Sequence, residues 1–244
     1  YTPGTRIARL SDATPQWVRR LAAPLRCLAC TSQSGSKLEF GQEIYTPEDT
    51  RRKALVVDDR PYAGWAYAAM TLFGERDVSA RRQAFNEVSL ELGVVGPAAG
   101  AARTQALMHR EQDIHVPRGW DYQLTNELGA VIRYKYGVRM PLGREGGAFR
   151  QDVSPYFEAA AGNIRMHVSG GVTWRSGRIL GDPDTIDAPA WRMYADVNTR
   201  IVGRNALLGG KIETGSYYSV EKESVVATVA RRCLASWIAT VPTP

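Results

Sequence analysis

The feature that most constrains the fold is the long segment 126–140, in which apolar and polar side chains alternate. One set is Leu128, Ala130, Ile132, Tyr134, Tyr136, Val138 and Met140, and the other is Glu127, Gly129, Val131, Arg133, Lys135, Gly137 and Arg139. Because successive side chains of a strand point to opposite faces, the segment predicts a strand with one apolar and one polar face. It is longer than the typical soluble strand of about five or six residues, and suits a tilted outer-membrane strand.

The same alternation recurs along the chain. In 164–175 we expect Ile164, Met166, Val168, Val172 and Trp174 to face outward, and 191–198 repeats the arrangement. Shorter alternating runs occupy 5–10, 38–45, 65–73 and 83–94, and 15–30 has helical spacing. Faces that carry both arginines and acids are costly in a dry core, so the pattern favours an antiparallel barrel with a polar interior. A soluble sandwich with a wet polar face remains the alternative.

Composition narrows the class of protein. With 44% hydrophobic and 23% charged residues the chain is not disordered, and no apolar run is long enough for a transmembrane helix. The net charge of +6 suits anionic head groups, whereas nucleic acid is not expected because no RNA-recognition or zinc-finger motif occurs. We see no linker, so 1–244 is predicted to be one domain, with 225–244 as an atypical tail that lacks alternation.

An Ala-rich segment at 98–110 lies between two predicted strands, bounded by turns at 96–97 and 117–121. It carries Gln105 and His109 four residues apart, which places both side chains on one face if the segment is helical. Spacing alone fits a solvated pair better than a catalytic pair.

Two further stretches are polar or aromatic at the ends of predicted strands. Residues 42–49 are followed by Arg51, Arg52 and Lys53, which suit either a solvated loop or a rim that binds anions. Residues 59–65 suit either a turn or an aromatic group at a membrane boundary.

In their order along the chain, these stretches resemble the lipid A 3'-O-deacylase family, outer-membrane barrels that remove an ester-linked acyl chain from lipopolysaccharide. The matching pieces are residues 1–4, 42–47, 59–65 and 93–97, Gln105 with His109, and 119–124 with Glu127. Each piece is weak alone, and their shared order makes the resemblance specific.

The resemblance implies an all-β, antiparallel up-and-down transmembrane β-barrel of twelve strands, with short helices in its loops, in the bacterial outer membrane. The family's first strand carries an Asn-Asp pair, and we expect this chain to lack that strand and the last one or two. The implied partners are lipid A, as part of lipopolysaccharide, and outer-membrane lipids, and we expect a monomer.

The resemblance also implies roles for individual residues. His109 matches the general base that activates water, since a neutral imidazole accepts a proton near neutral pH. Gln105 matches a position that orients the water or hydrogen-bonds the ester, and Thr2 matches a hydroxyl residue of the site. Arg52, or its neighbours Arg51 and Lys53, matches a cation that holds a glucosamine phosphate.

The family implies Ca2+ as the oxyanion stabiliser, and the sequence does not identify its ligands. Position 115, acidic in some members, is His115. Two alternatives to the hydrolase stay open. One is a non-catalytic or inactivated outer-membrane barrel, pore-like or structural, and the other is a soluble β-protein that binds an acidic ligand.

Overall fold

The computed structural model describes residues 2–11, 16, 20, 32–55, 59–143, 149–178, 191–209 and 225–230. Its strands are β1 (Thr2–Ser11), β2 (Ser32–Tyr45), β3 (Ala63–Ser79), β4 (Arg82–Val95), β5 (Glu127–Leu142), β6 (Phe149–Gly162), β7 (Arg165–Arg178), β8 (Trp191–Asn205) and β9 (Val225–Ala230). Its helical segments are η2 (Pro97–Ala99), α2 (Ala101–Glu111), η3 (Trp120–Tyr122) and α3 (Ala206–Gly209). None of the described helices is long and apolar enough to cross a membrane.

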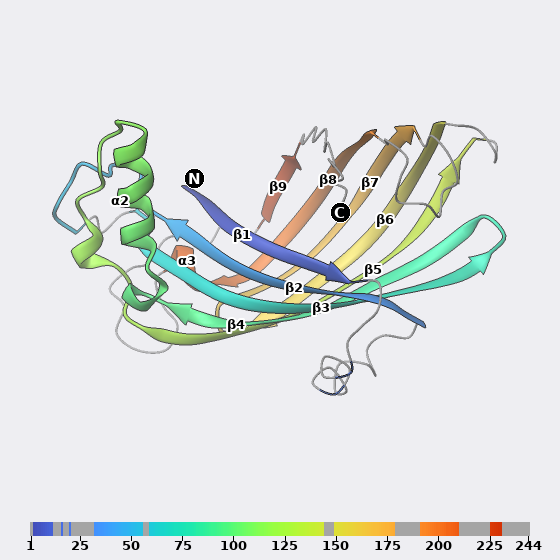
Figure 1. The fold of residues 1–244 in the computed structure, drawn as a ribbon, viewed down its shortest axis with the longest axis horizontal. Coiled ribbons are helices and arrows are strands. Elements are labelled where there is room, and N and C mark those ends of the chain that lie inside the picture. Colours follow the sequence, from blue (N-terminus) through green and yellow to red (C-terminus); the bar gives the residue numbers. More distant parts are fainter. Residues whose placement is uncertain are drawn as a thin grey trace, which may run out of the picture.

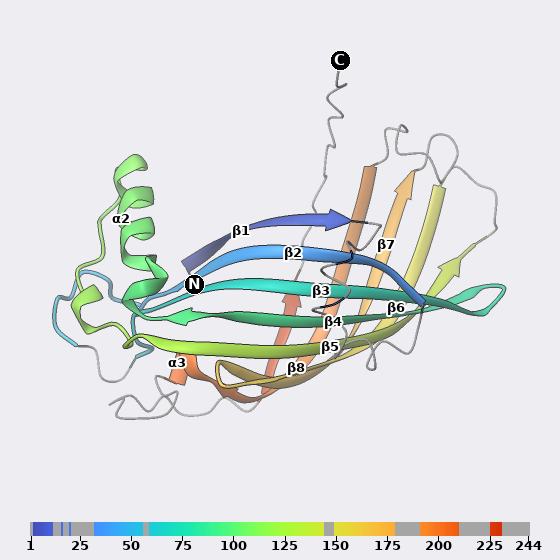
Figure 2. The same cartoon turned by 60° about the horizontal axis from the view of Figure 1, so that its bottom comes forward.

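The strands form one up-and-down sheet in which every strand pairs antiparallel with the next along the chain, from β1 to β9. Figures 1 and 2 show that this sheet curves strongly, with α2 standing at one end of the strands. Within the described residues β1 and β9 do not pair with each other, so the wall is open between them. The predicted all-β up-and-down barrel architecture is confirmed in this curved wall.

The side chains of β5 alternate between the outer and the inner face of the wall, as the sequence predicts. Leu128 is 82% exposed, whereas Val131 is completely buried. Most other exposed large apolar side chains of the wall follow the same parity as Leu128 from strand to strand, and they include Ile7, Phe40, Leu92, Ile132, Phe157, Val168, Val172, Val197 and Ile201. The wall therefore has an apolar outer face.

The inner face is polar, and its charges are paired. Arg165 of β7 donates to both carboxylate oxygens of Glu43 of β2 at 3.0 Å, and the Tyr45 hydroxyl donates to the same carboxylate at 2.8 Å. Glu43 and Arg165 come from strands five places apart in the sheet order, so this ion pair joins facing parts of the curved wall. Further inward ion pairs are Glu91–Arg133, Asp152–Arg175 and Glu75–Arg139, and Glu158 lies within hydrogen-bond distance of His167 at 3.1 Å.

An apolar cluster fills the interior at the end of the strands nearest α2. Its completely buried members include Trp65, Val131, Ile164 and Leu207. This placement corrects the prediction for Ile164, which does not face outward. It lies in the β6–β7 turn just before β7 begins, and there it packs over Gly129 and Trp65.

Three other predictions from the sequence are revised or stay untested. The alternating runs belong to strands that are longer than predicted, and β6 was not predicted at all. Part of the supposedly atypical tail, 225–230, forms β9 and pairs with β8. The helical segment near 15–30 and the rest of the tail lie almost wholly outside the described residues.

The cross-wall ion pair generates a prediction about stability. Arg165→Ala leaves the Glu43 carboxylate largely buried without its cation, so the free energy of unfolding should fall by about 3 kcal/mol. Unfolding in detergent micelles, followed by circular dichroism against urea, measures the change. Arg76→Ala, at an exposed position of β3, is the control and should alter stability by less than about 0.5 kcal/mol. Equal stability of the two variants would contradict a structural role for the pair.

Candidate functional site

Small residues bring α2 against the start of β3. A Cβ on Gly64 would lie 2.5 Å from the Cβ of Ala101 and 3.1 Å from that of Ala99, so only glycine permits this approach. Gly96 makes the preceding turn with a φ of 96°, a conformation that glycine adopts readily. The Gln42 side-chain amide then donates to the Ala99 carbonyl at 2.6 Å and ties η2 to β2.

From this point α2 crosses the strand ends. It contacts both β3 and β2, and Figures 1 and 2 both show the N-terminal end of β1 beside it. Thr2, the first residue of β1, pairs with Ile44, which in turn pairs with Gly64. The backbone of Thr2 therefore lies at the same rim as α2.

His109 lies on α2, half-buried, one turn beyond Gln105 as the sequence predicts. Its Nδ1 is 2.5 Å from the main-chain oxygen of His115. A carbonyl oxygen can only accept, so Nδ1 carries the hydrogen of this bond. In the neutral ring Nε2 is then the unprotonated nitrogen, the tautomer that a general base needs. The structure thus assigns an orienting contact to the backbone of residue 115 and not to its side chain.

Gln105 is almost completely buried and faces the wall side of α2. Its Oε1 accepts a hydrogen bond from the indole nitrogen of Trp120 at 2.9 Å. The Trp120 ring packs on Tyr62, with ring centroids 5.0 Å apart and an interplanar angle of 56°. Two motifs that are far apart in the sequence, 59–65 and 119–124, are therefore in contact through Tyr62 and Trp120, next to Gln105 of α2.

The Tyr62 ring also fixes the neighbouring loop. A Cβ on Gly119 would lie 2.4 Å from this ring and 3.2 Å from the Arg52 carbonyl oxygen, so glycine is required there. Burial, with a smaller contribution from the charge of Asp49, raises the pKa of the Tyr62 phenol, which stays protonated near neutral pH.

The same contact brings the three candidate cations to the rim. The Arg118 amide donates to the Thr50 carbonyl at 3.1 Å, so the β2–β3 loop touches the loop after α2. Arg51, Arg52 and Lys53 are exposed on that loop. The Arg52 guanidinium is 3.9 Å from Asp49, and both side chains are more than half exposed, so the pair is weak.

The described residues do not form a carboxylate site for calcium. No group of three or more His, Cys, Asp or Glu side chains with metal-binding geometry occurs among them. Asp59, on the same loop as the cations, accepts hydrogen bonds from the amides of Glu48 and Arg60 at 2.6 and 2.7 Å.

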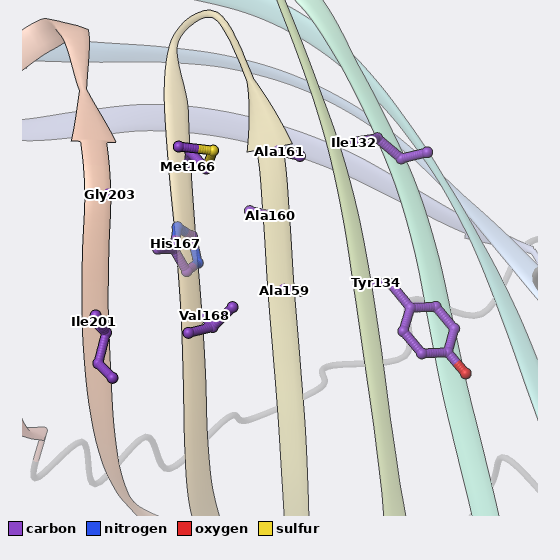
Figure 3. A pocket seen from close by; sticks show the side chains of 10 residues that line it. All are labelled: Ile132, Tyr134, Ala159, Ala160, Ala161, Met166, His167, Val168, Ile201 and Gly203. Carbon is purple, nitrogen blue, oxygen red and sulfur yellow. The ribbon is translucent and has the colours of Figure 1, made fainter.

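A hollow of about 550 Å³ lies elsewhere, on the outer face of β5 to β8. Figure 3 shows its lining, in which Ala159, Ala161 and Gly203 leave space between larger apolar side chains such as Ile132 and Met166. It lies several strands away from α2 and shares no residue with the rim.

Comparison with known proteins identifies the family. A family model described as "Outer membrane protein LpxR" matches residues 1–237. The chain belongs to the LpxR family. It is thus an outer-membrane protein, which excludes the soluble alternative. A solved structure, LpxR from Salmonella typhimurium, superposes with a TM-score of 0.66 at 18% identity, covering 91% of this chain and 85% of that chain. Comparison with curated protein sequences found no significant match.

The resemblance to the lipid A 3'-O-deacylase family included residues 119–124 but gave Trp120 no role. Trp120 and Gln105 lie 15 residues apart in the sequence and on different elements, so no helix or strand periodicity connects them. The available signal was that both belonged to pieces of the same family pattern.

The close approach of α2 to the LpxR-type wall generates a prediction. Gly64→Ala places a methyl group in contact with Ala101 and should push the start of α2 outward. Amide hydrogen exchange of α2 should then accelerate, which mass spectrometry measures on the peptide that covers 97–111. Gly170→Ala is the control, because its added Cβ would come no closer than 3.8 Å to a neighbouring atom. Unchanged exchange in the Gly64 variant would contradict the packing argument.

Proposed function

We propose that this chain is an ester hydrolase that removes the 3'-linked acyloxyacyl chain from lipid A of lipopolysaccharide. The observation that carries the proposal is the His109 imidazole on the rim helix of an LpxR-family protein, with Nδ1 bound to a carbonyl and Nε2 in the basic form. Geometry and membership of the family support it together. Neither would be sufficient alone.

The reaction needs one base and one acid step. His109 Nε2 takes a proton from water while the water oxygen bonds to the ester carbonyl carbon, and the π electrons of the carbonyl move to its oxygen. Collapse of this tetrahedral intermediate breaks the bond to the sugar oxygen, which receives the proton from His109 Nε2. The products are a carboxylic acid and the sugar hydroxyl. Throughout, the His115 carbonyl keeps the ring oriented.

Substrate binding is assigned to the rim around α2. The exposed cations Arg51, Arg52 and Lys53 would bind a glucosamine phosphate, because a guanidinium or ammonium forms charge-assisted hydrogen bonds with phosphate oxygens. We propose Thr2 as the hydroxyl residue of the site, since its backbone pairs with Ile44 at the same rim. Calcium is the metal ion that the family resemblance implies. When bound, it would polarise the ester carbonyl.

The non-catalytic, pore-like alternative is disfavoured by the packing of the interior. In the described part of the chain, Trp65, Ile164 and Leu207 are completely buried in an apolar cluster below the rim, and the charges of Glu91, Arg133, Glu43 and Arg165 beyond them are held in ion pairs. An apolar cluster at this end of the strands is not the polar lining that a water-filled pore needs. We propose that 1–244 acts as one domain and as a monomer.

Replacement of the base tests the function directly. His109→Ala should reduce deacylation by about 1000-fold, because it removes the proposed base that takes the proton from water. Mass spectrometry of lipid A incubated with the protein in detergent measures the released acyl chain. His115→Ala is the matched control, since it retains the carbonyl that binds Nδ1 and should stay within about twofold of wild type. Full activity of the His109 variant would refute the assignment.

The cation cluster generates a second functional prediction. Combined replacement of Arg51, Arg52 and Lys53 by alanine should raise KM for phosphorylated lipid A by about tenfold, while kcat changes little. For lipid A that lacks this glucosamine phosphate, the variant and wild type should have the same KM. Kinetic assays with both substrates make the comparison. An equal rise in KM for both substrates would argue against phosphate recognition.

A further inference from the structure

The hydrogen bond between Trp120 and Gln105 fixes which end of the Gln105 amide is available to a substrate. An indole nitrogen can only donate, so the atom of Gln105 that faces it must be the oxygen. The distance from Trp120 Nε1 to Gln105 Oε1 is 2.9 Å. Because the Gln105 residue is only 3% exposed, this bond is protected from competition by water.

Trp120 is itself held rigidly. Its ring packs on the buried ring of Tyr62 at 5.0 Å between centroids. Its carbonyl accepts a hydrogen bond from the Gln123 side chain at 3.0 Å, and the Leu124 amide donates to the Tyr62 carbonyl at 3.0 Å. The donor that selects the amide orientation is thus anchored from two sides.

The Gln105 nitrogen is consequently the end directed away from Trp120. No described residue accepts a hydrogen bond from it, and it lies on the helix face that carries His109 one turn further on. On the basis of the proposed hydrolysis, we infer that Gln105 donates an N–H to the ester carbonyl oxygen, and that Trp120 is the positioning residue that keeps the amide in this orientation.

The inference decides between the two roles that the sequence left open for Gln105. An amide oxygen would be needed to orient the attacking water, but the Gln105 oxygen is turned toward the Trp120 indole and the nitrogen is the end directed away from it. An amide N–H aimed at the carbonyl oxygen stabilises the negative charge that develops there during attack. A reversed amide would instead bring its oxygen toward the developing oxyanion, which is repulsive. Trp120 excludes that arrangement before substrate binds.

Two substitutions test the role of Gln105 as the hydrogen-bond donor and that of Trp120 as the positioning residue separately. Gln105→Glu keeps an oxygen for Trp120 but replaces the N–H donor by an acceptor, so kcat should fall by about 100-fold with little change in KM. Trp120→Phe keeps the ring against Tyr62 and removes only the indole N–H, so the amide can reverse. We expect kcat to fall by about tenfold, again without a change in KM, and no additional loss when this change is combined with Gln105→Glu.

The controls separate failure of the inference from failure of the proposed function. Trp174→Phe, on β7 away from the rim, should keep wild-type kcat. Wild-type and His109→Ala proteins are assayed beside the variants, and inactive wild type would refute the proposed hydrolysis. In either case, the indole N–H resonance of Trp120 in 15N-tryptophan-labelled protein should shift in Gln105→Ala, which reports the bond without activity. Active wild type with undiminished kcat in both Gln105→Glu and Trp120→Phe, or an unshifted resonance, would overturn the inference.

Discussion

The wall of this protein is a single sheet. Polar side chains on its inner face therefore need hydrogen-bonding or ionic partners in the interior. The Glu43–Arg165 ion pair meets this constraint between two strands that face each other across the concave side. Glu43 also lies two residues before the end of β2, where the loop with the three cations begins. An interaction that holds the wall together therefore also fixes the strand from which part of the rim is built.

The rim depends on close packing more than on polar contacts. Gly64 and Gly119 each occupy a place where a methyl group would collide, the first with α2 and the second with the Tyr62 ring. These two approaches bring together the β2–β3 loop and the long connection between β4 and β5. Because the apolar cluster around Trp65 lies directly below, the rim rests on a packed interior, which is a suitable support for a site that must hold its geometry.

The sequence predicted features that are local and strongly periodic. The faces of β5 and the one-turn spacing of Gln105 and His109 follow from two-residue and helical periods, and the structure has both. It missed β6, because Pro155 and the small residues near the strand end weaken the pattern of that strand. Ile164 was misplaced because an alternating pattern does not show where a strand begins. The contact between Trp120 and Gln105 was beyond reach, since it depends on the packing of two loops.

The two candidate site residues on α2, His109 and Gln105, share one physical arrangement. Each has one polar atom bound by a group whose hydrogen-bonding role is fixed by its chemistry, a carbonyl that only accepts for His109 and an indole N–H that only donates for Gln105. What remains is an acceptor on one side chain and a donor on the other, one helical turn apart. Ester hydrolysis needs this combination, because the base must accept a proton while the carbonyl oxygen receives one hydrogen bond. Since the group that orients His109 is main chain, the side chain at position 115 can differ among relatives without changing the tautomer.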